Sequence, residues 1–172
     1  MIDASVFPEK TRGYLGASAI GHPCMRRVQY DWMCDPEHPA RIRDIFDRGH
    51  YFEGRTREHF IHAGFKFAPD DKLRFTALAG MLSGHADGIF VDGPKIRDIT
   101  YPCLWEHKAI NAKGWHSLDR DGLIKAYPQY AAQVSLYQHF LALPYPAIFT
   151  AVNADSCERV HLLVPFDTDK AN

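Results

Sequence analysis

The sequence predicts an α/β fold in which helices flank a mixed central sheet, and three observations favour this fold class. A long segment with helical spacing of apolar residues is followed by short apolar runs between turn residues, and a second helical segment leads into two closing apolar runs. This order is typical of helices packed on a sheet. The length of 172 residues is that of one such unit, so we expect a single domain over 1–172.

The helices are predicted from apolar spacing and from residues that start or stop a helix. Ser18 is placed to cap a short first helix, and residues 24–32 have helical spacing of large side chains. In 41–63, Ile and Phe recur at three- and four-residue steps, and Gly64 is well placed to stop that helix. The last helix, 128–143, begins with a proline, Pro128, and a second proline, Pro144, follows its end.

The strands are predicted from short apolar runs. We expect them at 65–67, 73–75, 81–91, 103–110, 148–152 and 160–164, as strands of one sheet. Successive side chains of a strand point to opposite faces, so Glu106 and Lys108 should share one face, with Trp105 and His107 on the other.

Composition excludes several classes of protein. A hydrophobic fraction of 46% is too high for a disordered chain, and no apolar run approaches the roughly 18 residues of a membrane span. The first residues lack a signal-peptide pattern, so we expect no membrane partner and a cytoplasmic location, in a bacterium or a phage-infected host. The four cysteines form no Cys-x-x-Cys pair, which predicts free buried thiols rather than a zinc ribbon or a disulfide framework.

Three residues carry the chemistry that the sequence suggests. Glu106 and Lys108 place a carboxylate beside an ammonium, and Asp87 ends an earlier strand between Gly84 and Gly88. A sheet that pairs these strands would bring Asp87 next to Glu106. Two convergent carboxylates suit a hard cation, Mg²⁺ or Mn²⁺, which prefers oxygen ligands and keeps waters for reaction. Phosphodiester hydrolysis is the chemistry that such a site favours, with the backbone carbonyl of His107 as a further metal ligand. The alternative is a plain surface ion pair.

Gln133 and Tyr137 lie four residues apart on one face of the last helix, directed towards the same region. With Gly84-x-x-Asp87-Gly88 and Glu106-x-Lys108 they form an ordered pattern. In this the sequence resembles the RecB-like branch of the PD-(D/E)XK nucleases, which includes the lambda-exonuclease type and the CRISPR-adaptation nucleases. The N-terminal part, Ser18 followed by Cys24-Met25-Arg26-Arg27, is also similar to the Ser-then-Cys-x-Arg opening of those nucleases. The resemblance therefore covers roughly 15–141.

The resemblance implies a restriction-endonuclease-like core and a role for each matching residue. Asp87 and Glu106 would bind the metal, Lys108 would be the catalytic lysine, and Gln133 and Tyr137 would support the lysine or the substrate phosphate. A helix-borne acid or histidine completes the family's metal site; Glu53 is the preferred match, and His50, one turn earlier, is its rival.

Further residues invite interpretation. Arginines crowd the N-terminal half among acids, and we single out Arg26 and Arg27 for nucleic-acid phosphates. Trp115 and His116 are expected on a loop that could stack on nucleic acid. A zinc site at His59 and His62 has little support, because no acidic partner accompanies them.

The resulting expectation is an Mg²⁺- or Mn²⁺-dependent deoxyribonuclease, foremost an exonuclease of recombination, repair or phage DNA metabolism. A restriction-like endonuclease and a catalytically inactive DNA- or protein-binding module are the alternatives. DNA is the expected partner, with a homo-oligomer or a recombination protein as a further one. Relatives often continue into another helix where this chain stops, and the sequence leaves open whether a C-terminal helix is missing.

Overall fold

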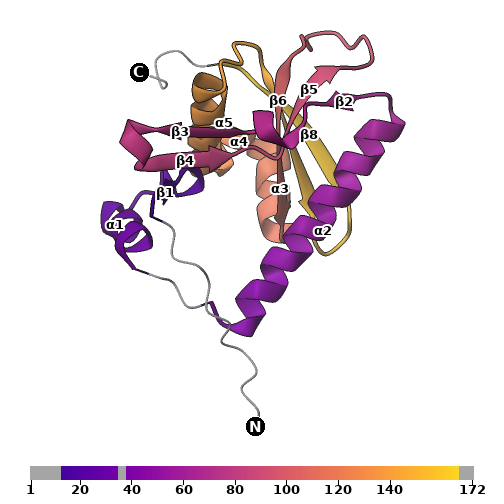
Figure 1. Cartoon of the computed structure of the whole chain (residues 1–172). Coiled ribbons are helices and arrows are strands. Elements are labelled where there is room, and N and C mark those ends of the chain that lie inside the picture. Colours follow the sequence, from indigo (N-terminus) through magenta and orange to yellow (C-terminus); the bar gives the residue numbers. More distant parts are fainter. Residues whose placement is uncertain (1–12, 35–37, 167–172) are drawn as a thin grey trace.

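The computed structural model describes residues 13–34 and 38–166, which fold into helices packed around two sheets (Figure 1). The elements follow in the order β1 (Leu15–Gly16), η1 (Ala17–Ala19), α1 (Met25–Met33), α2 (Ala40–His62), β2 (Lys66–Phe67), η2 (Asp70–Lys72), β3 (Arg74–Ala77), η3 (Leu78–Gly80), β4 (Leu82–His85), β5 (Gly88–Asp92), β6 (Cys103–Ile110), α3 (Ala112–Asp121), α4 (Leu123–Ala126), α5 (Pro128–Phe140), β7 (Ala147–Asn153) and β8 (Arg159–Val164).

The larger sheet has five strands in the order β2-β5-β6-β7-β8, and it is mixed as expected. Strands β6 and β7 run parallel, whereas the other neighbours are antiparallel. The crossover between the parallel pair consists of α3, α4 and α5, which is the helical connection that parallel neighbours require.

Alternation along β6 sends its side chains into two separate cores. Leu104 and Ile110 join the apolar cluster with α3, α4 and α5, whereas Cys103 and Trp105 join an aromatic cluster against which Phe60 of α2 packs. Helices therefore cover both faces of the sheet, and the alternation predicted for this strand is confirmed.

The prediction of one sheet is wrong. Strands β1, β4 and β3 form a separate three-stranded sheet, in which β1 pairs parallel with β4 and β3 pairs antiparallel. The apolar run 81–91, predicted as one strand, divides into β4 and β5, and Ala86 and Asp87 form the link between the two sheets. A continuous apolar run does not reveal this division, because both halves are partly buried.

Two further expectations need correction. Trp115 and His116 lie on α3 rather than on a loop, and Trp115 is buried against the core; Asn111 caps this helix by accepting a hydrogen bond from the Gly114 N–H at 2.9 Å. Three of the four free cysteines are exposed, and only Cys103 is buried.

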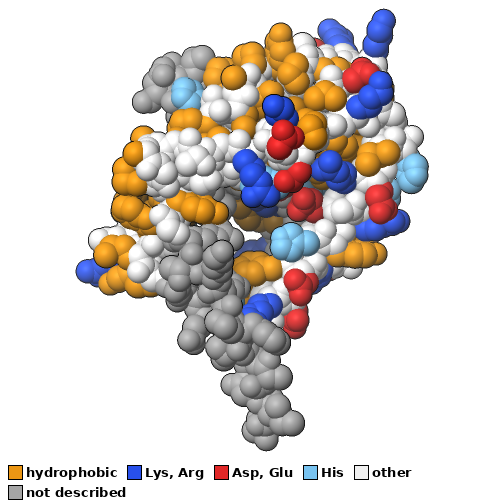
Figure 2. Space-filling view, in the orientation of Figure 1, with side chains coloured by type: hydrophobic (Ala, Val, Ile, Leu, Met, Phe, Trp, Pro, Cys, Tyr) orange, Lys and Arg blue, Asp and Glu red, His pale blue; other side chains and the backbone are white. Residues whose placement is uncertain are grey.

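The surface differs from side to side. Figure 2 shows hydrophobic side chains gathered over α1 and the tip of the β3–β4 hairpin, where Met25, Met33, Leu78 and Met81 are exposed, whereas charged side chains of both signs lie over α2. Among the described residues, no helix is long and apolar enough to cross a membrane.

Candidate active site

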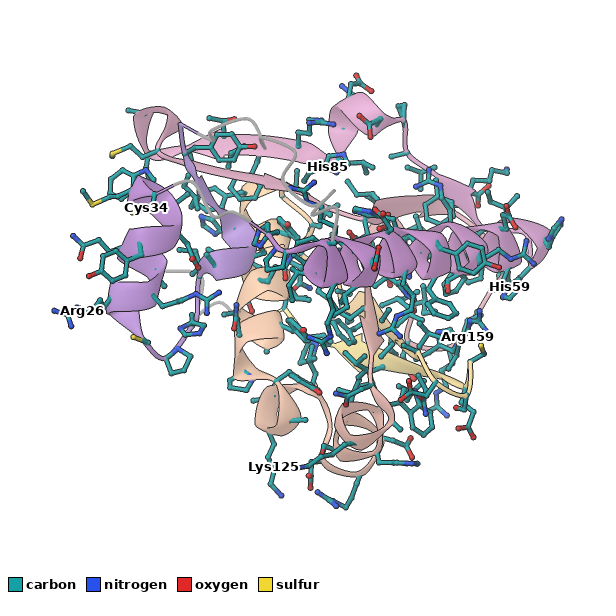
Figure 3. All side chains as sticks on the ribbon, turned by 90° about the horizontal axis from the view of Figure 1, so that it is seen from below. Arg26, Cys34, His59, His85, Lys125 and Arg159 are labelled. Atoms are coloured by element: carbon teal, nitrogen blue, oxygen red, sulfur yellow. The ribbon has the colours of Figure 1, made fainter. Side chains whose placement is uncertain are left out.

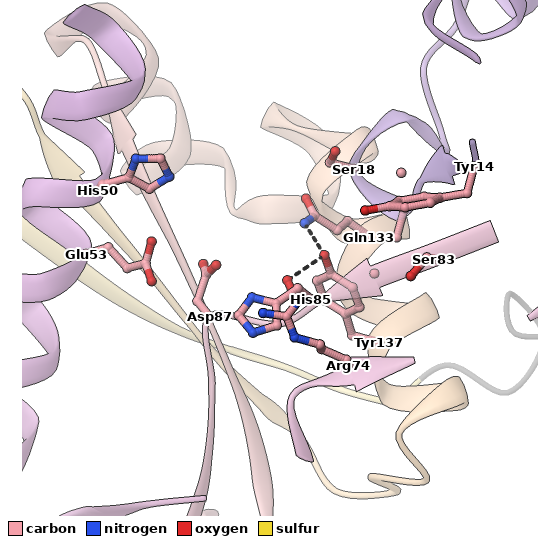
Figure 4. A pocket seen from close by; sticks show the side chains of 13 residues that line it. Tyr14, Ser18, His50, Glu53, Arg74, Ser83, His85, Asp87, Gln133 and Tyr137 are labelled. Atoms are coloured by element: carbon pink, nitrogen blue, oxygen red, sulfur yellow. Dashed lines mark hydrogen bonds between the residues drawn. The ribbon is translucent and has the colours of Figure 1, made fainter. Parts of the chain in front are cut away.

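A cavity of about 590 Å³ opens between α2, the three-stranded sheet and α5. Its lining comes from segments far apart in the sequence: Tyr14, Gly16, Ala17, Ser18, His50, Glu53, Arg74, Ser83, Gly84, His85, Asp87, Gln133 and Tyr137 (Figure 4). The predicted residues Glu53, Asp87, Gln133 and Tyr137 therefore share one cavity.

Asp87 is held by contacts with two elements. Its Oδ2 accepts a hydrogen bond from the His107 backbone N–H at 2.7 Å, and its carbonyl accepts one from Nη1 of Arg57 at 3.3 Å. The Arg57 guanidinium lies 4.1 Å from the centre of the Phe67 ring. This cation–π contact helps to hold Arg57 in place next to Asp87. The first contact joins the Asp87 carboxylate to β6, as the sequence predicted, and the part played by Arg57 was not foreseen.

Glu106 and Lys108 form an ion pair on the face of β6 opposite Trp105. Nζ of Lys108 donates to Oε1 of Glu106 and lies 5.5 Å from the centre of the Tyr130 ring. Glu106 is fully buried, and its second oxygen, Oε2, has no hydrogen-bond partner among the residues that the structure describes. A buried carboxylate oxygen without a partner is costly, and a proton or a cation would offset this cost.

Three carboxyl groups surround this one ammonium. Burial, and then the nearby Asp87, raise the pKa of Glu53 to about 7. Burial and Asp87 also raise the pKa of Glu106 to about 8, against the opposing effect of Lys108. Burial lowers the Lys108 pKa, but Glu106 and Asp87 more than offset this and hold it above its usual value. The cluster thus holds three carboxyl groups near one lysine, and Arg57 acts on Glu53 as a second positive charge.

His50 and Glu53 both line the cavity from α2, and Figure 4 shows Glu53 directed towards Asp87. Besides burial, the charges of Asp87 and Lys108 shift the pKa of Glu53, which places its carboxyl within the charged cluster. The direction of its side chain and these charges favour Glu53 over His50 as the third residue of the predicted metal site.

Gln133 and Tyr137 support the strand that leads to Asp87. Nε2 of Gln133 donates to the Tyr137 hydroxyl at 3.1 Å, and that hydroxyl donates to the His85 carbonyl, also at 3.1 Å. The phenol is buried, and burial followed by the charge of Glu106 raises its pKa. The pair therefore fixes the end of β4, two residues before Asp87.

Gly84 allows α5 to approach β4 this closely. A Cβ atom at position 84 would lie 2.5 Å from Cε1 of Tyr137 and 2.4 Å from Cε1 of Phe75. Gly88 likewise lies against Phe67 and Trp105, which a Cβ atom would meet at 2.8 Å. The two glycines flanking Asp87 thus permit close packing of aromatic rings.

His107 contributes its backbone to the site and its side chain to the other face of the sheet. Its ring lies 5.8 Å from that of Trp105, and neither ring nitrogen has a hydrogen-bond partner within the described part of the chain. Burial, assisted by the charge of Lys108, lowers its pKa to about 3, so the ring is neutral at ordinary pH. A metal-binding role for its carbonyl stays a prediction.

The remaining predicted residues lie elsewhere. Arg26 and Arg27 are exposed on α1 and do not line the cavity; Arg27 pairs with Asp31 at 3.3 Å, and Figure 3 shows Arg26 at the outer edge of the molecule. Within 13–34 and 38–166, no three His, Cys, Asp or Glu side chains converge into a finished metal site. His59 and His62 are therefore not part of such a site.

The overall arrangement has a counterpart among solved structures. The chain is similar to the crystal structure of SSO0001, with a TM-score of 0.51 and 14% sequence identity over 95% of this chain and 73% of that one. This likeness establishes an α/β fold of mixed sheets and helices. No known family model and no curated protein matches the sequence.

Seven cavity residues were not identified as site residues from the sequence: Tyr14, Gly16, Ala17, Ser18, Arg74, Ser83 and His85. Tyr14, Arg74 and His85 drew no attention, and Ser18 was singled out only as a helix cap and as part of the N-terminal resemblance. Arg74 and His85 become neighbours only because β3 pairs with β4. No spacing along the chain signals that pairing in advance.

Proposed function

We propose that this protein is a metal-dependent deoxyribonuclease with a restriction-endonuclease-like core of the RecB-like PD-(D/E)XK type. The observation that carries the proposal is the assembly of Glu53, Asp87, Glu106 and Lys108 from three separate elements into one electrostatically coupled cluster beside an open cavity. An incidental surface ion pair would not need a second and a third acid brought from distant parts of the chain.

The cluster fits a divalent cation. Glu106 is buried with one oxygen unpartnered among the described residues, and the pKa values of Glu53 and Glu106 are raised first by burial and then by the nearby charge of Asp87. Glu53, Asp87 and Glu106 would hold Mg²⁺ or Mn²⁺, since oxygen donors suit these ions. Such an ion, when bound, polarises the phosphoryl oxygens and lowers the pKa of a bound water.

Lys108 supplies the fixed positive charge of the site. Its ammonium is protonated at neutral pH, and its contacts with Glu106 and the Tyr130 ring restrict where it can point. In that position it can orient the attacking water or offset the charge that develops on phosphorus. Gln133 and Tyr137 act on the geometry of Asp87 through the His85 carbonyl.

Exonuclease action remains the leading form of the proposal, and a restriction-like endonuclease with the same site is the second. A catalytically inactive binding module is the non-enzymatic alternative, and one observation favours it: the carboxyl groups lie near one another without closing on a single point. Oligomerisation and a recombination partner stay predictions.

The test compares linear double-stranded, linear single-stranded and supercoiled DNA with Mn²⁺, Mg²⁺ or EDTA. The variant Lys108→Ala removes the fixed charge, and Lys113→Ala, an exposed lysine on α3, is the matched control. We expect metal-dependent cleavage that Lys113→Ala keeps and Lys108→Ala loses by at least about a hundredfold.

The substrates separate the candidates. Degradation of linear DNA with an intact closed circle indicates an exonuclease, whereas cleavage of the circle indicates an endonuclease. A folded protein that binds Mn²⁺ in calorimetry but cleaves none of the three substrates contradicts the enzyme proposal. Absence of both metal binding and cleavage favours the inactive module.

A further inference from the structure

The wall of the cavity opposite α2 carries positive charge of its own. Arg74 on β3 and His85 on β4 are directly paired in the small sheet, and both side chains line the cavity that Glu53 and Asp87 enter (Figure 4). The two basic residues therefore face the same space as the acids, yet they belong to a different sheet.

These two side chains share one exposed counter-ion. Asp70 of η2 accepts from Nη2 of Arg74 at 3.3 Å and is 3.0 Å from Nε2 of His85. The Arg74 side chain is 64% exposed and that of Asp70 is 68% exposed. Exposed pairs of this kind contribute little to stability, so an incoming anion can replace Asp70 at small cost. A guanidinium fork beside an imidazole suits phosphate oxygens.

The cavity is divided by charge. Among the described residues that line it, Glu53 and Asp87 are the acidic ones, and they lie on the α2 side and at the link between the sheets. The opposite side adds the hydroxyl groups of Tyr14, Ser18 and Ser83 to Arg74 and His85. If the reacting phosphate lies at the acids with a metal ion, the next phosphate of the same strand cannot approach those acids without repulsion. The basic wall is where it can be accommodated.

We infer that Arg74, with His85, binds the phosphate adjacent to the one that is cleaved, so that the substrate is a polynucleotide strand with at least two consecutive phosphates. The inference rests on the proposed function and defines its substrate class. It also gives Asp70 a role, because this carboxylate occupies the phosphate position when no strand is bound and competes with the strand for it.

The first arm of the test varies the number of phosphates in the substrate. Hydrolysis of a single-stranded oligonucleotide and of bis(para-nitrophenyl) phosphate, which has one phosphate, is measured with Mn²⁺ for the wild type, Arg74→Ala and the control Arg97→Ala. Arg97 is exposed on the β5–β6 connection and does not line the cavity. We expect Arg74→Ala to lower kcat/KM for the oligonucleotide about tenfold, mainly through KM, and to leave the single phosphodiester unchanged.

Two outcomes of this arm would overturn the inference. An equal loss on both substrates means that Arg74 acts only on the fold, and no loss on either means that it is an ordinary surface arginine. If the wild type hydrolyses neither substrate, the proposed function fails by itself, and the second arm then decides the inference.

The second arm measures oligonucleotide binding in EDTA by fluorescence anisotropy over a range of salt concentrations. Arg74→Ala should weaken binding about tenfold and reduce the slope of log K against log salt by about one. Asp70→Asn should instead tighten binding several-fold, because it removes the competing carboxylate while keeping the size of the side chain. Binding that Asp70→Asn leaves unchanged or weakens would contradict the competition and with it the inference.

Discussion

The excess of buried carboxyl groups predicts that the metal-free protein loses stability as the pH rises through neutrality. In the folded chain the pKa of Glu53 is about 7 and that of Glu106 about 8, against 4.5 for a free glutamate. Between those limits the folded state binds more protons than the unfolded state. Raising the pH therefore favours unfolding across this window, and the effect is complete above the folded pKa values.

The size of the effect follows from these pKa values. Each pKa unit corresponds to about 1.4 kcal/mol, so between about pH 6.5 and about pH 8.5 the titration of Glu106 alone removes about 2 kcal/mol of stability. For a chain of this length such a loss lowers Tm by about 4–8 °C. His107 acts in the opposite sense, because its depressed pKa costs stability only as the pH falls below 6.5, so the chosen window excludes it.

The assay is thermal unfolding in EDTA across this window for the wild type, Glu106→Gln and Glu58→Gln. Glu106→Gln should at least halve the fall in Tm, whereas Glu58→Gln, which alters an exposed glutamate on α2, should keep it in full. A Tm that is constant or rises with pH in EDTA would refute the reasoning, as would a fall of the same size in Glu106→Gln.

Three further predictions concern metal binding and packing around the site. The stabilisation of Tm by Mn²⁺ should grow from about pH 6.5 to about pH 8.5, because a metal must displace protons from the carboxyl groups; a gain that is independent of pH would contradict this. Gly84→Ala should cost about 1–3 kcal/mol in urea unfolding, since its Cβ atom meets Tyr137 and Phe75, and an unchanged midpoint would show that the rings can move aside. Asn111→Ala should cost about 1 kcal/mol in the same measurement because α3 loses its N-cap, whereas Asn111→Asp should retain most of the stability.

The sequence by itself determined the elements whose signals are local. The alternation of β6 identified the two faces of that strand, and the prolines around 128–143 identified the start and end of α5 within a few residues. Helix α2 was predicted to within a residue or so at each end. These predictions succeed because the period of a strand or a helix and the residues that cap it lie within one stretch of chain.

The order of Asp87, Glu106 and Lys108 along the chain also led to the proposed chemistry, which stays a prediction, since residue type alone makes carboxylates and a lysine suitable for a metal-assisted hydrolysis. Trp115 shows the limit of such reasoning. Asn111 is a helix cap, but the polar residues after it were interpreted as a loop, and burial of the indole against the core decided for a helix.

Only the tertiary structure decided how the cavity is composed. The division of 81–91 at Ala86 and Asp87 places Asp87 between two sheets, and the pairing of β3 with β4 brings Arg74 beside His85. Burial raises the pKa of Glu106, and this burial depends on neighbours from other elements. Each of these features arises from contacts between distant segments, and such contacts leave no periodic signal in the sequence of either segment.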